Sequence, residues 1–520
     1  MHVHAFLTTI IALPSQWWIV VFATAGFLYV LSKLIYRLSP LHPLSGIPGP
    51  FVGRITDLNL VYHSYKGDEA QYVHSLHQRY GPVIRIAHDS VDFTHVSALE
   101  GIYLKKGGFL KPRYYNNFDI DGHASIFSNT DLVERAARAK AILPLFSISN
   151  IKAGSRPFNE SISRFLHKLK EQKATGRANV LDLARGMSID GVTEYLFGVR
   201  YGALQDDAYA QKEHSIKPKS TGTQRMAAST VVDTFVLTSR FWYLPTWLYD
   251  LADRVDAFIY PNPTVAPSTD ILNEYADRVI SHAVELLDSQ QKGVGEGGVN
   301  ATANYPVRLL RAGFSHSETR AQCKDIIFAA TDTIGMNLAT VCFMLAKYPE
   351  TYNKLHTEVT NAIITHVDDI QNIPYLICVV REALRLSMTN PCRLPRAVPA
   401  GGWTYEGRFY PAGTIVSCSA YEMHLSSDIF PEPLEFRPER WDAATDAMKK
   451  SFMPFGLGGR QCIAKSMSLL ELHQVLYDIV QADILRGARP VTKTISILEG
   501  FTAKVIGGDI GLVWDASSSD

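Results

Sequence analysis

The 520-residue chain has no excess of either charge, because its 51 Lys and Arg residues balance 51 Asp and Glu residues. It therefore lacks the basic surplus of a nucleic-acid binder. Cysteine is also scarce: six residues lie between positions 323 and 462, and none forms a C-x-x-C pair. This spacing argues against a thiolate zinc site and against a disulfide-stapled secreted protein. With 46% hydrophobic residues, the chain is not disordered and can bury a large core.

Charged residues are absent from Ala5 to Ser32, and the stretch from Trp17 to Leu31 is almost wholly apolar. Because about 20 apolar residues span a bilayer, this run is long enough for a transmembrane helix. Aromatic residues of the kind found at membrane interfaces stand at both ends of the run: Trp17, Trp18 and Tyr36.

The charges that flank this run predict its orientation. Lys33 and Arg37 follow it and no Lys or Arg precedes it, so the positive-inside rule predicts a lumenal N-terminus and a cytosolic body. A cleaved signal peptide is the alternative, since Ala23-Thr24-Ala25 resembles a cleavage site. The lack of positive charge before the run and its continuation past that site favour an uncleaved anchor.

Prolines punctuate the segment after the anchor, at Pro43, Pro48 and Pro50. Since proline fixes φ and restricts the preceding residue, we expect a stiff, extended spacer. The chain is therefore expected to consist of an N-terminal membrane anchor (1–40), a Pro-rich hinge (41–60) and a folded body (61–520).

Helical periodicity dominates the body. Apolar residues recur at helical spacing in six segments: 132–145, 161–171, 271–287, 318–345, 349–367 and 374–386. Short runs bounded by Gly, Pro and Asp, at 83–86 and 415–418, are typical of strands. The predicted fold class is mainly α with small β-sheets (α+β), preceded by one transmembrane helix.

The most informative stretch surrounds Cys462. Three glycines precede this cysteine closely, and residues 465–475 have the pattern of a helix. Glycines allow positive φ and a close approach of the backbone to a flat ligand. A cysteine at a helix N-terminus meets the positive end of the helix dipole, which favours the thiolate. Arg460 can pair with an anionic group on the same ligand.

This stretch resembles the haem-binding loop F-x-x-G-x-R-x-C-x-G of the cytochrome P-450 family. Phe455, Gly458, Arg460 and Cys462 match the pattern, and Ala464 replaces its last glycine. The resemblance implies the cytochrome P-450 fold with bound haem b. It makes Cys462 the axial ligand of the haem iron and the other three matching residues part of the cofactor site.

A second motif resembles the helical E-x-x-R of the same family. Glu382 and Arg385 are three residues apart and share a helix face. The family's third partner is the arginine of a P-E-R segment, which is Arg440 here. An E-x-x-R alone is usually only a solvated ion pair. Three charges from two distant segments imply a structural role for Glu382, Arg385 and Arg440.

A third motif lies in the middle of the apolar segment 318–345. Threonines in helices often bond back to their own backbone, but an acid such as Asp332 needs a reason there, since unpaired burial is costly. The segment resembles the family's A-G-x-D-T-T, with Ala330 and Ile334 as departures. The resemblance implies that Asp332 and Thr333 are catalytic and supply protons during oxygen activation.

Two more arginines are expected at the cofactor. Arg396 matches a family arginine that often contacts a haem propionate. The family usually has Trp or His, then Arg four residues later, in the helix before residues 145–147, whereas this chain has Arg135 and Ala139. We expect Arg135 to contact a propionate, with Arg138 or Lys140 assisting.

Family position also predicts the substrate-facing wall, which we expect from residues 114–126, 328–333 and 387–394. The aromatic stretch 241–247 suits either a membrane-dipping entrance or core packing.

The resemblance implies a monooxygenase that inserts one oxygen atom from O2 into a lipophilic small molecule, by hydroxylation, epoxidation or multistep oxidation. Electrons would come from NADPH through NADPH–cytochrome P-450 reductase, with cytochrome b5 as a further candidate partner. The anchor and hinge resemble those of fungal microsomal members of secondary metabolism. We therefore expect a single-pass protein of the endoplasmic reticulum membrane that acts on a terpenoid, polyketide or alkaloid.

Two alternatives remain open. The first is an oxygen-independent haem-thiolate isomerase or dehydratase of the same fold, which the presence of Asp332 and Thr333 disfavours. The second is a membrane-anchored haem carrier or sensor without turnover, for which the acid and the alcohol would be unneeded.

Overall fold

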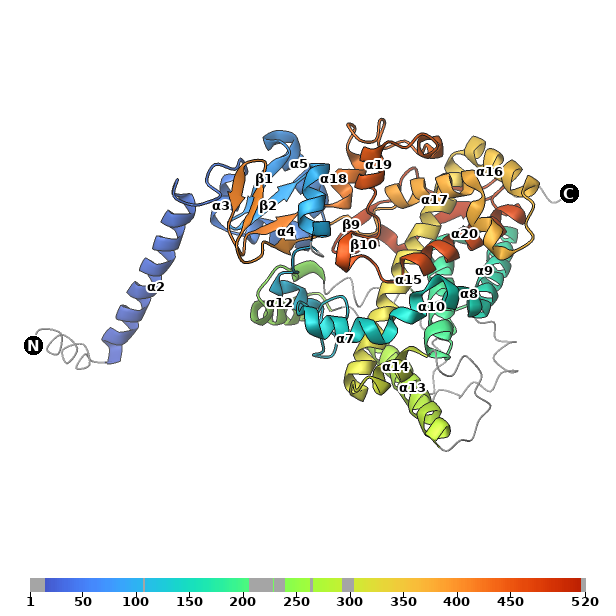
Figure 1. Cartoon of the computed structure of the whole chain (residues 1–520), viewed down its shortest axis with the longest axis horizontal. Coiled ribbons are helices and arrows are strands. Elements are labelled where there is room, and N and C mark those ends of the chain that lie inside the picture. Colours follow the sequence, from blue (N-terminus) through green and yellow to red (C-terminus); the bar gives the residue numbers. More distant parts are fainter. Residues whose placement is uncertain are drawn as a thin grey trace, which may run out of the picture.

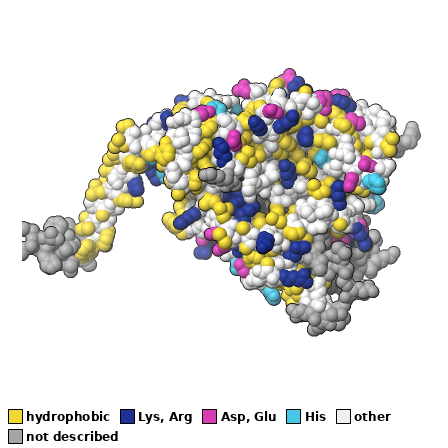
Figure 2. Space-filling model, viewed as in Figure 1, with side chains coloured by type: hydrophobic (Ala, Val, Ile, Leu, Met, Phe, Trp, Pro, Cys, Tyr) yellow, Lys and Arg dark blue, Asp and Glu magenta, His cyan; other side chains and the backbone are white. Residues whose placement is uncertain are grey.

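The structure is a computed structural model that describes residues 15–105, 108–204, 228, 239–261, 265–291 and 304–515. One long helix, α2 (Ser15–Leu38), projects from a body of helices and small sheets (Figure 1). Apolar side chains are exposed along α2 (Figure 2), and its segment Trp18–Leu38 is long and apolar enough to cross a membrane. The first 14 residues of the predicted anchor lie outside the described residues.

Helices make up most of the described body, as predicted. Those of seven or more residues are α4 (Leu58–Lys66), α5 (Glu69–Tyr80), α7 (Leu132–Ile142), α9 (Arg156–Ala174), α10 (Val180–Phe197), α12 (Thr246–Ile259), α13 (Val265–Gln291), α14 (Tyr305–Arg311), α15 (His316–Lys347), α16 (Pro349–Asn361), α17 (Pro374–Leu386) and α20 (Lys465–Gln481). The shorter ones are α3 (Phe51–Ile55), α6 (Val96–Leu99), α8 (Ile148–Ala153), α18 (Ala420–Leu425) and α19 (Asp446–Ser451).

A four-stranded sheet lies at the end of the body nearest the anchor (Figure 1). Its order is β1 (Val83–Ala87), β2 (Ser90–Phe93), β7 (Ile415–Ser417) and β4 (Arg396–Ala397). β2 and β7 pair in parallel, and the other neighbours are antiparallel. The smaller sheets pair β9 (Ile497–Glu499) with β10 (Ala503–Val505), β5 (Trp403–Tyr405) with β6 (Arg408–Tyr410), and β11 (Gly511–Val513) with β3 (Arg177–Asn179) and β8 (Arg489–Pro490).

The long helix α15 runs through the middle of the body and packs closely on α10 (Figure 1). Gly335 permits this approach, because a Cβ at that position would lie 2.5 Å from Cγ of Arg185. Although α15 is also long and apolar enough to cross a membrane, most of it is buried, as in the core helix of a soluble body. The largest hydrophobic cluster surrounds α15 and includes Phe165, Met187 and Leu476.

Three local predictions need correction. The helix expected over 132–145 ends at Ile142, because Pro144 diverts the chain into the 3-10 turn η4 (Leu143–Phe146). The helix expected over 349–367 ends at Asn361, and a new turn, η6 (Val367–Asn372), starts where Asp369 accepts the backbone N–H of His366.

The segment after the anchor is not an extended spacer, since residues 39–47 form turns. Leu44 and Ile47 are buried in one cluster with Val91 and Phe93 of β2. Burying these apolar side chains fastens the segment to the body.

Candidate active site

One large cavity collects most of the predicted site residues. Its lining comes from separated parts of the chain that include residues 111–127, α7, α15, the turn after α17, β4, α18, the loop before α20 and the turn between β9 and β10. The predicted residues on its wall are Arg135, Asp332, Thr333, Arg396, Phe455, Arg460 and Cys462. The substrate-facing segments predicted from family position also contribute to this wall, through Tyr115, Ile126, Phe328, Thr389 and Leu394 among others.

The loop around Cys462 is held by its own backbone. The Cys462 N–H donates to the Phe455 carbonyl at 2.9 Å, across a 3-10 turn, η8 (Gly458–Arg460). The Cys462 side chain is accessible, although the residue lies deep in the body, because its accessible surface faces the cavity. Burial raises the pKa of its thiol, while the Ala464 N–H and the Lys465 charge act in the opposite direction. Within this chain, burial therefore outweighs the expected effect of the helix start.

Gly458, a predicted cofactor residue, is not among the described residues that line the cavity, but it shapes the loop before Cys462. Its φ is +67°, and a Cβ would lie 1.8 Å from the Tyr103 carbonyl oxygen. No side chain fits in that space. Glycine is therefore required where the loop passes Tyr103.

Four cationic side chains line the same cavity: Lys111, Arg135, Arg396 and Arg460. Arg460 donates through Nη1 to the Asn129 carbonyl at 2.8 Å. Its buried Nη2, like the buried Nε of Arg135, has no hydrogen-bond partner among the described residues. Burial lowers the pKa of Arg460 to about 10, with Arg135 and Arg396 adding repulsion. The unpaired nitrogens of Arg460 and Arg135 therefore suit an anionic ligand.

Lys111 was not predicted, because no motif marks it in the sequence. Its Nζ donates to the Phe127 carbonyl at 2.6 Å. Burial, followed by repulsion from Arg396, Arg460 and Arg135, holds its pKa well below the usual range. The expected helpers Arg138 and Lys140 are not among the described lining residues. Arg138 is instead within ion-pair distance of Glu134 and Glu318, at 3.6 and 3.4 Å.

The acid and the alcohol of α15 have different surroundings. Arg185 of α10 donates to Oδ1 of Asp332 from Nε at 3.0 Å and from Nη2 at 2.5 Å, with both side chains almost fully buried. Thr333 donates its hydroxyl to the Ala329 carbonyl at 2.8 Å. Arg185 was missed because 147 residues separate it from Asp332.

Glu382, Arg385 and Arg440 form one buried cluster that lies outside the described cavity lining. Glu382 accepts from Nη2 of Arg385 at 2.8 Å, from Nε of Arg440 at 2.9 Å and from Nε1 of Trp441 at 3.0 Å. Both arginines also donate to carbonyls between residues 424 and 435. The cluster thereby fastens α17 to the segment that leads to the Cys462 loop.

The aromatic stretch 241–247 was expected to form either a membrane-dipping entrance or part of the core, and its residues differ in this respect. Trp242 is fully buried and packs against Tyr115 and Phe501, so it belongs to the core. Trp247 is 71% exposed and begins an exposed apolar face of α12.

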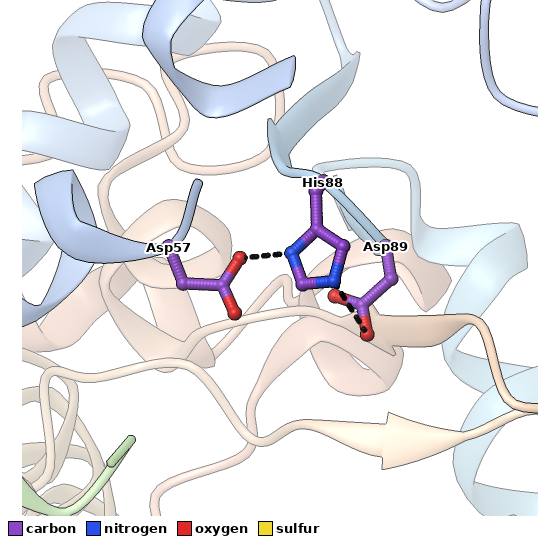
Figure 3. A group of neighbouring side chains, drawn as sticks. All are labelled: Asp57, His88 and Asp89. Atoms are coloured by element: carbon purple, nitrogen blue, oxygen red, sulfur yellow. Dashed lines mark hydrogen bonds and ion pairs between the residues drawn. The ribbon is translucent and has the colours of Figure 1, made fainter. Parts of the chain in front are cut away.

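A separate group of potential metal ligands lies beside the sheet. His88 stands between two carboxylates, with Nδ1 2.5 Å from Asp57 and Nε2 3.8 Å from Asp89 (Figure 3). Because these contacts already pair the imidazole and tie the start of α4 to the β1–β2 turn, we assign no metal here.

The donor set of the large cavity fits haem. A thiol opens onto it, unpaired guanidinium nitrogens suit carboxylates, and the glycine loop keeps its backbone clear of side chains. These features define a haem-thiolate protein.

Comparison with known proteins agrees with this reading. Residues 43–482 match the cytochrome P-450 family, and the chain belongs to that family. A cytochrome P-450 monooxygenase of Annulohypoxylon moriforme, mfmF, is 34% identical over 500 residues, covering 93% of this chain and 97% of the relative. The monooxygenase tazI of Aspergillus terreus is 28% identical, covering 91% of each chain. The chain is thus an enzyme of the cytochrome P-450 monooxygenase class, and these relatives do not favour the oxygen-independent alternative.

Proposed function

We propose that this protein is a membrane-anchored haem-thiolate monooxygenase of fungal secondary metabolism, which oxidises a lipophilic small molecule such as a terpenoid, polyketide or alkaloid. The observation that carries the proposal is the shared cavity of Cys462, the four cations and the Asp332–Thr333 pair. Aromatic and aliphatic side chains supply much of the remaining wall, including Phe127, Phe328 and Phe501, which suits an apolar substrate.

In this proposal the Cys462 thiolate would bind the haem iron. Arg460, Arg396 and Arg135, joined by Lys111, would hold the propionates, and Phe455 and Gly458 would shape the loop that receives the cofactor. Bound haem would supply the activation of dioxygen, which thiolate ligation promotes.

Asp332 and Thr333 would relay protons into the cavity, with the Asp332 carboxylate taking up a proton before passing it on. Both residues line the cavity, and general acid catalysis requires an acid within hydrogen-bond reach of the reacting group or of a bridging water. The Arg185 ion pair keeps Asp332 in one orientation. The Thr333 hydroxyl, which now donates to the Ala329 carbonyl, can rotate its hydrogen toward a partner in the cavity, because hydroxyl hydrogens turn to suit their acceptors.

The proposed electron source is NADPH through NADPH–cytochrome P-450 reductase, with cytochrome b5 as a further partner. Monooxygenases of this family need a redox partner. A membrane-bound partner is consistent with a membrane-anchored body.

The proposed location is the endoplasmic reticulum membrane, with one span and a cytosolic catalytic domain. The exposed apolar helix α2 supports the span, and Lys33 and Arg37 support its orientation. Exposed apolar residues on the body support a second membrane contact: Trp247, Leu251, Val255 and Phe258 of α12, with Leu58 and Tyr62 of α4.

The absorption spectrum of the reduced, carbon-monoxide-bound protein tests the proposal. We expect a strongly red-shifted Soret band that Cys462→Ala abolishes, while Cys342→Ala, a buried cysteine of the core cluster, retains it. A Soret band at the position of histidine-ligated haem, or no bound haem, would contradict the proposal.

A further inference from the structure

A second cavity lies directly behind one wall of the Cys462 cavity. Neighbouring residues face the two chambers: Tyr114 and Arg393 line the second, whereas Tyr115 and Leu394 line the first. The second cavity also reaches Leu60 of α4 and Thr246 at the start of α12. It is therefore lined in part by α4 and α12, the two helices that also carry the exposed apolar residues named above.

The partition between the chambers is aromatic. The rings of Tyr114 and Tyr243 meet edge to face at 5.5 Å on the side of the second cavity. Behind them, Trp242 packs 5.5 Å from Tyr115 and 5.4 Å from Phe501, both on the wall of the Cys462 cavity. These ring contacts are packing contacts, so they can separate and re-form without the loss of a hydrogen bond.

Hydrogen bonds of Asn117 link the segment that carries Tyr114 and Tyr115 to the segment that carries Trp242 and Tyr243. The Asn117 amide donates to the carbonyls of Trp242 and Leu244 at 3.0 and 2.8 Å, and its carbonyl accepts from the Thr246 hydroxyl at 2.9 Å. The 3-10 turn η3 (Arg113–Phe118) and residues 242–246 are thus joined.

A buried charge pair connects that unit to the rest of the body. The Tyr243 hydroxyl donates to Oε1 of Glu69 on α5. Arg393 donates to the same oxygen through Nε at 3.2 Å, and its guanidinium lies 5.2 Å from the centre of the Tyr243 ring. Glu69 is fully buried, and its Oε2 has no hydrogen-bond partner among the described residues.

Further hydrogen bonds fix Arg393 to the four-stranded sheet. Arg393 donates through Nη1 to the Ser417 hydroxyl at 3.1 Å, and Ser417 donates to Asp92. Asp92 also contacts Nε2 of His77 at 3.0 Å. The Glu69–Arg393 pair is therefore anchored in α5 and the sheet, and Tyr243 is the member that can leave.

We propose that the second cavity is the vestibule through which lipophilic substrate reaches the Cys462 cavity, and that the Tyr243–Glu69 hydrogen bond is the clasp that holds the partition closed. The inference rests on the proposed function, because it takes the Cys462 cavity as the site of oxidation. Tyr243 is a positioning residue here, since it controls passage and does not take part in the chemistry.

Binding kinetics of two azoles to the full-length holoprotein test the clasp. Clotrimazole is too bulky to pass a closed partition, whereas imidazole is small, and both shift the Soret band on binding haem iron. In Tyr243→Phe we expect clotrimazole to associate and dissociate about tenfold faster with an unchanged Kd, since losing one hydrogen bond to a charged group lowers the opening cost. Imidazole rates should not change.

Tyr348→Phe is the matched control, because Tyr348 also donates to a glutamate, Glu435, at 3.4 Å but on the surface. Unchanged clotrimazole rates in Tyr243→Phe, or a changed Kd with an unchanged association rate, would overturn the clasp. Hydrogen exchange of residues 241–248 gives a readout that does not need haem, and it should be faster in Tyr243→Phe than in Tyr348→Phe. Wild-type protein without any azole shift would count against the haem site, while equal exchange in the two variants would count against the clasp.

Discussion

Arg185 and Asp332 form a buried ion pair that joins the first half of α10 to the middle of α15, with nitrogen–oxygen distances of 3.0 and 2.5 Å. The pair is possible because Gly335, one turn away, lets the two helices come close. An acid at the cavity wall is thereby held by a partner on a different helix. Its orientation depends on how α10 and α15 pack.

Arg185→Gln should destabilise the protein by about 3–5 kcal/mol, because it leaves the Asp332 charge buried without its partner. The free energy of unfolding from urea titrations measures this change. Arg156→Gln is the control, since Arg156 pairs with Glu160 at 2.7 Å but is 88% exposed, and its loss should cost less than about 1 kcal/mol. Equal stability losses in the two variants would show that the buried pair has no special role.

Thr333→Val should keep the carbon-monoxide spectrum and lower product formation by about 10²- to 10⁴-fold, the usual contribution of a positioned proton donor. More of the electrons drawn from NADPH should appear as hydrogen peroxide. The ratio of peroxide to product, with any compound that the wild-type protein oxidises, measures this. Thr331→Val is the control, because Thr331 bonds to the Ile327 carbonyl and is fully buried. An unchanged ratio in Thr333→Val would remove Thr333 from the mechanism.

Gly458→Ala and Gly456→Ala separate backbone strain from steric clash. Both glycines have φ of +67°, so each alanine pays about 1–2 kcal/mol for its left-handed conformation. Only at position 458 does the new Cβ meet a backbone atom, at 1.8 Å, whereas at position 456 the nearest atom lies 3.8 Å away. Haem content per protein should therefore fall sharply in Gly458→Ala and mildly in Gly456→Ala. Similar haem content in both variants would argue against a close approach to Tyr103.

Glu382→Gln should cost about 3–5 kcal/mol of stability, since two buried arginines lose their shared carboxylate. We expect little folded haem protein, measured as holoprotein recovered per total protein. Glu439→Gln is the neighbouring control, because Glu439 pairs with Lys354 at 2.7 Å where both side chains are about half exposed. Normal recovery of Glu382→Gln would contradict a scaffold role for the cluster.

Short segments of the chain encode their own local features, and these could be predicted without the fold. The Cys462 loop, the E-x-x-R pair and the Asp332–Thr333 pair each lie within a few residues, and their backbone form follows from local glycine content and helical periodicity. The helix and strand positions were predicted for the same reason, apart from ends set by Pro144 and by the His366–Asp369 cap. The division of the chain at residues 40 and 60 stays a prediction.

Which distant side chains meet depends instead on how the helices and sheets pack. Arg185 reaches Asp332 across 147 residues, and Tyr243 reaches Glu69 across 174. Lys111 joins three arginines that lie on α7, on β4 and in the Cys462 loop. Such contacts depend on helix packing distances and on the burial of whole faces, which no local pattern encodes. The residue types of the Cys462 cavity could therefore be predicted from the sequence. The second cavity and the Tyr243–Glu69 clasp could not, because they depend on tertiary packing.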